Sequence, residues 1–165
     1  MDLLGAVSLR WVSRLLVLLI VVAIIASAYE LYCEYLAAKN LRVEIAGVSI
    51  VRVGLASADL DIKLKFTNPT THETPVFWVD SYQVYINNIY VGSGSLPLMK
   101  VPANTVIYCS TTLTVEYEKA GLAVLQAIKQ GSFEVKVEGV VKAKILSNLI
   151  TISTPFTTTR TVALS

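Results

Sequence analysis

The sequence contains little of what most catalytic and metal sites are built from. Its 165 residues include one histidine, His72, and two cysteines, Cys33 and Cys109, which lie 76 positions apart. A zinc site needs several such ligands at short spacing, and a disulfide-rich domain needs more cysteines than this. The sequence therefore predicts no metal site, no cofactor and no disulfide framework.

Charged residues are also scarce. They make up 16% of the chain, and 14 basic against 12 acidic residues leave a net charge of +2. This small excess of basic residues does not indicate the basic surface of a nucleic-acid-binding protein, so we expect no nucleic-acid partner. A hydrophobic content of 54% excludes intrinsic disorder, because disordered chains are poor in apolar residues.

The apolar residues are concentrated near the start of the sequence. Residues 15–29 carry no charge, and the apolar character extends over the 22 residues 12–33, about 33 Å of helix. This length matches the hydrocarbon core of a bilayer, which is about 30 Å thick. Aromatic side chains suited to the membrane interface flank the span. They are Trp11, Tyr29, Tyr32 and Tyr35. We expect one transmembrane helix that continues to Lys39, with the lipid bilayer as its partner.

The orientation and the fate of this helix are separate questions. Arg10 and Arg14 directly precede the apolar span, which favours a cytoplasmic N-terminus and an extracytoplasmic domain. A cleaved signal peptide is the alternative, with residues 15–25 as its apolar region and cleavage following Ala28 to give a secreted domain. A buried core helix is disfavoured, because the run has no polar face.

From Leu41 onward the hydrophobic period changes from that of a helix to that of a strand. In residues 59–67, Leu60, Ile62, Leu64 and Phe66 alternate with charged or polar residues. Strict alternation predicts a half-buried strand of an antiparallel sheet. Further strands are predicted at 43–53, 76–87, 89–91, 105–117, 132–145 and 149–163.

Helix and turn signals complete the expected order. Residues 118–130 predict a helix that ends at Gly131. Its apolar stripe would consist of Leu122, Leu125 and Ile128. Gly92, Gly94 and Pro97 predict a loop after the short strand 89–91. Pro155 indicates that the last strand is an edge strand or is bent.

These elements predict a mostly β protein, an antiparallel β-sandwich of the fibronectin or immunoglobulin type with about seven strands and one short helix. Residues 41–165 would form this sandwich domain. Residues 1–40 would form the N-terminal transmembrane anchor and its stalk.

An ordered set of motifs runs through the expected sandwich. It consists of Phe66-x-Asn68-Pro69, Pro75, Tyr82-x-Val84-Tyr85, Gly92-x-Gly94, Pro97 and Val101-Pro102-Ala103. Over residues 41–165 this order resembles the type-2 late embryogenesis abundant proteins, also called the water-stress-and-hypersensitive-response (WHy) domain family. The resemblance implies a fibronectin-type sandwich, often with one membrane span, and an association with desiccation and other stress. It brings no catalytic or cofactor residue to this chain.

The candidate polar sites have simple explanations. His72 lies in a polar loop without the partners that a catalytic triad requires. Asp59 and Asp61 share a strand face with lysines, which indicates a solvated surface. Residues 92–95 resemble a phosphate-binding loop, but a proline and a strand follow instead of a helix.

The remaining candidates are the two cysteines and one Asn-x-Thr sequence. Cys109 is expected to be inert within a strand. Cys33 lies at the membrane boundary, where it is either an ordinary helix residue or a site of lipidation or of a disulfide between two copies. Asn68-Pro69-Thr70 is no glycosylation acceptor, because proline follows the asparagine. We therefore predict no catalytic, cofactor-binding or metal-binding residue.

The sequence thus predicts a membrane-anchored, non-enzymatic β-sandwich protein with a protective or stress-related role at the cell surface. The alternative is a structural or interaction subunit of an envelope-associated assembly that uses an exposed strand edge. Other proteins or further copies of this chain remain open as partners, and no small-molecule substrate is expected.

Overall fold

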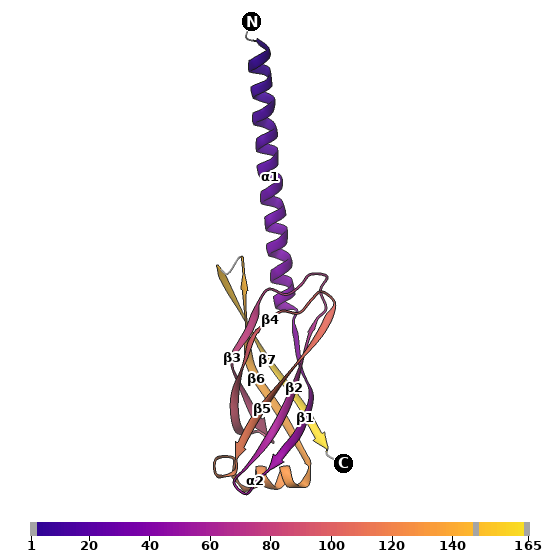
Figure 1. Ribbon diagram of the computed structural model, residues 1–165, viewed down its shortest axis with the longest axis vertical. Helices are drawn as coiled ribbons and strands as arrows, with labels where there is room; N and C mark the ends of the chain where they lie inside the picture. Colours follow the sequence, from indigo (N-terminus) through magenta and orange to yellow (C-terminus); the bar gives the residue numbers. More distant parts are fainter. Residues whose placement is uncertain (1–2, 147–148, 164–165) are drawn as a thin grey trace.

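The computed structural model, which describes residues 3–146 and 149–163, has a long helix standing at one end of an elongated β-sandwich (Figure 1). The helix α1 spans Leu3–Lys39, and the first strand begins only a few residues later, at Arg42. The apolar sequence therefore forms one continuous helix that ends at the predicted residue.

Two antiparallel sheets form the sandwich. One sheet has the strand order β1-β2-β5 and the other the order β4-β3-β6-β7. This confirms the predicted sandwich of seven strands, and Pro155 lies on the edge strand β7 as expected. The strands are β1 (Arg42–Val53), β2 (Ser57–Asn68), β3 (Phe77–Ile86), β4 (Ile89–Met99), β5 (Thr105–Glu116), β6 (Ser132–Ile145) and β7 (Ile150–Ala163).

The core lies between the sheets and follows the alternation read from the sequence. In β2 the side chains of Leu60, Ile62, Leu64 and Phe66 are fully buried. The intervening Lys63 is exposed, and its Nζ lies 4.8 Å from the centre of the Tyr108 ring. One face of β2 therefore meets the opposite sheet and the other faces away from the core. The predicted half-buried strand is confirmed.

The loop predicted from Gly92, Gly94 and Pro97 is wrong, because all three residues lie within β4. Gly94 passes directly over the buried ring of Tyr82, and a Cβ at this position would come within 2.5 Å of Tyr82 Cζ. The glycine therefore makes room for a core side chain instead of marking a turn. Pro97 is tolerated because β4 is an edge strand.

The predicted stripe on the second helix also needs correction. The helix α2 (Tyr117–Gln130) has a non-helical residue, Gly121 at φ 82°, and Gly131 closes it in the left-handed conformation. Leu122 follows this break and is 76% exposed, while Val124 and Ile128 are buried. The residues buried on α2 are Ala120, Val124, Ala127 and Ile128. The turn after Gly121 lies outside the core, which the apolar spacing did not indicate.

Candidate functional site at the helix–sandwich junction

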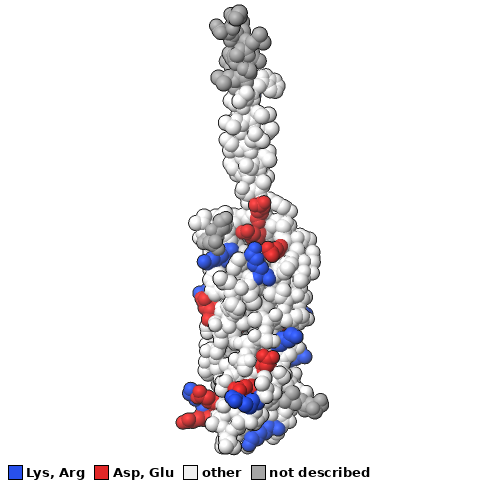
Figure 2. All heavy atoms as spheres, in the orientation of Figure 1, with Lys and Arg blue, Asp and Glu red and all other residues white. Residues whose placement is uncertain are grey.

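The exposure of α1 changes abruptly along its length. The side chains from Trp11 to Tyr29 are exposed, whereas Cys33, Ala37 and Ala38 are buried at the end of the sandwich. Within the described part of the chain, α1 is the one helix long and apolar enough to span a membrane, judged by length and composition. On the face drawn in Figure 2, charged side chains gather on the sandwich and at its junction with α1, and the part of α1 between this junction and the grey atoms shows none.

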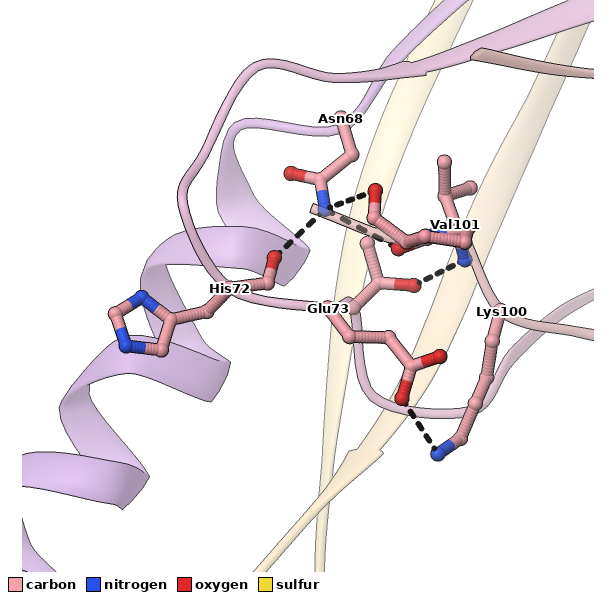
Figure 3. Close-up of polar contacts among 7 residues, drawn as sticks. Asn68, His72, Glu73, Lys100 and Val101 are labelled. Atoms are coloured by element: carbon pink, nitrogen blue, oxygen red, sulfur yellow. Dashed lines mark hydrogen bonds and ion pairs between the residues drawn. The ribbon is translucent and has the colours of Figure 1, made fainter. Parts of the chain in front are cut away.

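A buried asparagine organises the loop that meets α1. Asn68 ends β2 and is 1% exposed. Its Nδ2 donates to the carbonyl oxygens of His72 at 2.7 Å, Val101 at 3.2 Å and Pro102 at 3.1 Å (Figure 3). Its Oδ1 accepts from the amide of Thr70 at 3.0 Å and from the hydroxyl of the same residue at 2.7 Å. One amide side chain thus joins the β2–β3 loop to the β4–β5 loop.

Thr74 strengthens the same connection. Its Oγ1 accepts a 2.8 Å hydrogen bond from the amide of Val101, and its own amide donates to the carbonyl of Val101 at 3.0 Å. Outside the core, Lys100 Nζ pairs with Glu73 Oε2 at 3.1 Å (Figure 3). Asn68 and Thr74 are the two buried polar residues among the described ones, which fits the rule that buried polar groups are hydrogen-bonded.

The loop held in this way presents His72 to the helix. His72 is exposed, and its ring points towards α1, with its centre 6.1 Å from that of Tyr29 in an edge-on contact (Figure 3). The histidine of the polar loop therefore contacts α1 just before the helix meets the sandwich, which its sequence context did not indicate. Among the described residues, no group of three or more His, Cys, Asp or Glu side chains could hold a metal ion.

A pocket of about 270 Å³ lies between α1 and this loop. Glu30 and Glu34 of α1 line it together with Glu73 and Lys100 of the sandwich. Cys33 also lines this pocket but is buried, so lipidation or a disulfide between copies would first require the junction to open.

Asp59, Cys109 and Asp80 lie on the sandwich, away from this junction. Asp59 Oδ2 pairs with Arg52 at 2.9 Å, and its Oδ1 accepts from Thr114 at 2.8 Å. Burial raises the pKa of the Cys109 thiol, which disfavours the reactive thiolate. The hydrogen bonds from Lys142 and then Trp78 to Asp80 lower the pKa of that carboxyl group.

Similarity to known proteins is confined to the fold. No model of a known protein family and no curated protein matches the chain. A solution structure of a protein from Arabidopsis thaliana is similar with a TM-score of 0.58 and 16% identity, over 76% of this chain and 82% of that one. At this identity, the likeness shows a shared sandwich fold.

Two further solved structures are similar at a coarser level. A candidate late embryogenesis abundant protein matches with a TM-score of 0.45 and 12% identity, over 93% of this chain and 87% of that one. A β-glucuronidase of glycoside hydrolase family 2 matches with a TM-score of 0.44 and 15% identity, over 69% of this chain but 12% of the enzyme. Neither match is strong enough to assign an activity.

Proposed function

We propose that this chain is a single-span membrane protein that holds a non-enzymatic β-sandwich against the bilayer surface, where it protects the membrane under stress. The observation that carries the proposal is the exposure pattern of α1. Its apolar length has no cover within the described chain, whereas one face of its last turns, with Cys33, Ala37 and Ala38, is buried against the sandwich. A lipid bilayer supplies the missing cover, because burial of apolar side chains is the main favourable term in such contacts.

The junction supports a rigid connection between anchor and domain. The network around Asn68 fixes the loop that carries His72, and His72 contacts Tyr29 of the helix. Few residues separate the end of α1 from β1, so no flexible linker intervenes. We infer that the sandwich is held at the membrane surface and is not tethered loosely above it.

The protective role rests on the resemblance of the ordered motifs to the water-stress family. Asn68 of the Asn-Pro motif has a structural role in this chain, since its side chain links two loops at the end of the sandwich that meets α1. We further propose a cytoplasmic N-terminus, which follows from the basic residues before the span.

Anchoring and protection can be tested separately. The protein should remain in the membrane pellet after a carbonate wash, with its N-terminal segment intact by mass spectrometry. A mature protein beginning at Tyr29 would show that the segment is a cleaved signal and would refute the anchor. Protease added to intact cells should digest the sandwich, and protection until lysis would reverse the orientation.

Protection is measured on dye-loaded vesicles that are dried and rehydrated. Vesicles with the full-length protein should leak less than vesicles with a peptide of residues 1–40, because the sandwich supplies the proposed effect. Equal leakage would refute a protective role. Isolation in a stable stoichiometric complex after gentle detergent extraction would favour the alternative, a subunit of an envelope assembly.

A further inference from the structure

The hairpin between β6 and β7 lies at the membrane end of the sandwich, beside α1. Figure 1 shows the end of β6 and the start of β7 reaching past the base of the helix at the same end of the sandwich. The amide of Leu146 donates a 3.2 Å hydrogen bond to Glu34 Oε2 of α1. Ile145 lines an apolar pocket of about 320 Å³ together with Ala28, Leu31 and two tyrosines of the helix. The hairpin is therefore fixed at the level where the exposed apolar length of α1 ends.

This end of the hairpin carries apolar side chains that the described chain leaves uncovered. Leu146 is 40% exposed, Leu149 is 79% exposed and Ile150 is 45% exposed. Leu146 has a φ of 52°, a conformation in which glycine or asparagine is usual. Leu146 therefore carries backbone strain that glycine or asparagine would avoid, and such strain is frequent at functional sites.

The surroundings have the composition of a membrane interface. Tyr32 and Tyr35 of α1 are exposed and line the same apolar pocket as Ile145. In β6, next to Ile145, the Nζ of Lys144 lies 5.7 Å from the centre of the Trp78 ring. Tryptophan and tyrosine are enriched at the level of lipid headgroups, and lysine favours anionic headgroups there.

We propose that Leu146, Leu149 and Ile150 form a second membrane contact, inserted at the boundary between the headgroups and the acyl chains. This contact rests on the proposed function, since it is made with the same bilayer that α1 crosses. The apolar surface of α1 continues onto the hairpin across the Ile145 pocket, which is why lipid is the partner that fits. Two contacts side by side would fix the tilt and rotation of the sandwich, which a single helix leaves free.

Exposed leucines also occur at the opposite end of the sandwich, and they provide the matched control. Leu122 of α2 is 76% exposed, almost as much as Leu149. Figure 1 places α2 at the end remote from α1. A probe at Leu122 therefore measures what an exposed leucine position experiences away from the membrane.

The test uses the full chain with Cys33 and Cys109 replaced by alanine, reconstituted in vesicles of phosphatidylcholine and phosphatidylglycerol. An environment-sensitive fluorophore is attached through Leu149→Cys, through Leu122→Cys or, as the reference within the span, through Ile20→Cys. We expect blue-shifted emission and quenching by spin-labelled lipid at position 149, several-fold stronger than at position 122. Near-ultraviolet circular dichroism confirms that each variant is folded.

The outcomes separate the two proposals. Water-like emission at position 149 with a lipid signal at position 20 would overturn the hairpin contact and leave the anchor intact. Water-like emission at position 20 would overturn the anchor itself. A blue shift at position 149 that lipid-borne quenchers do not affect, and that disappears at one protein copy per vesicle, would assign the hairpin to a contact between copies and overturn the lipid contact.

Discussion

Replacing Asn68 by alanine should destabilise the sandwich, because it removes one amide side chain that bonds to two loops. The carbonyls of Val101 and His72 keep a second donor, from the amide of Thr74 and the hydroxyl of Thr70. The carbonyl of Pro102 and the amide of Thr70 lose the partner that Asn68 supplies. A buried polar group left unpaired costs about 1–3 kcal/mol. With partial access of water to the half-buried groups, we expect a loss of about 2–4 kcal/mol.

The measurement is a urea unfolding curve of the full-length chain in detergent micelles. The chain has two tryptophans, Trp11 in α1 and Trp78 in β3, so a Trp11→Phe background leaves one reporter inside the sandwich. Thr71→Ala in the same loop is the control. Thr71 is exposed and bonds only to the ring of His72 at 3.1 Å, so a change within about 0.5 kcal/mol is expected. Equal costs for the two variants would refute the role assigned to Asn68.

Asn68→Asp tests the same network through pH. It keeps the acceptor for Thr70 but places a carboxylate against three carbonyl oxygens, which disfavours the charged form and raises its pKa above the unfolded value of about 3.9. The full penalty should therefore apply above the raised pKa, and stability should recover as the pH falls through it towards the unfolded value. Asn68→Ala should not show this recovery, and a parallel pH dependence of the two variants would contradict the geometry.

Two further substitutions test the sandwich. Gly94→Ala should cost about 1–3 kcal/mol in the same unfolding assay, because the new methyl group overlaps the buried ring of Tyr82; Gly47→Ala, with no atom within 4 Å of its Cβ, should be nearly neutral, and equal costs would refute the overlap. Asp80 should titrate below the ordinary carboxyl range by NMR, and Lys142→Met should raise its pKa. The lowered pKa makes the pair stabilising above the unfolded pKa, a contribution that is lost as the pH falls through the folded pKa.

The sequence predicted those parts of the fold that depend on local pattern. The alternation of β2 was read correctly, because each residue of a half-buried strand faces either the core or solvent. The glycines of β4 were misread because the reason for Gly94 is Tyr82, a residue of the neighbouring strand. Such a contact leaves no trace in the spacing of the β4 sequence itself.

The junction was predictable only in outline. The Asn-Pro pair correctly marked the end of β2, but two of the acceptors of Asn68 lie 33 and 34 positions further along the chain. The contact of His72 with Tyr29 likewise joins the sandwich to the helix over a distance that no local motif records. Thr74 gave no signal, because one threonine among several in a polar loop does not reveal that it will be buried.

The short connection between α1 and β1 has a consequence for the proposed place of the sandwich at a membrane. The sandwich is elongated roughly along the direction of the helix (Figure 1), and β6 and β7 each have 14 residues, about 46 Å at ~3.3 Å per residue. A domain that cannot fold over at its base acts as a spacer of fixed height. In the proposed arrangement, molecules that stand close together would keep a second bilayer away from the first by up to the length of these strands.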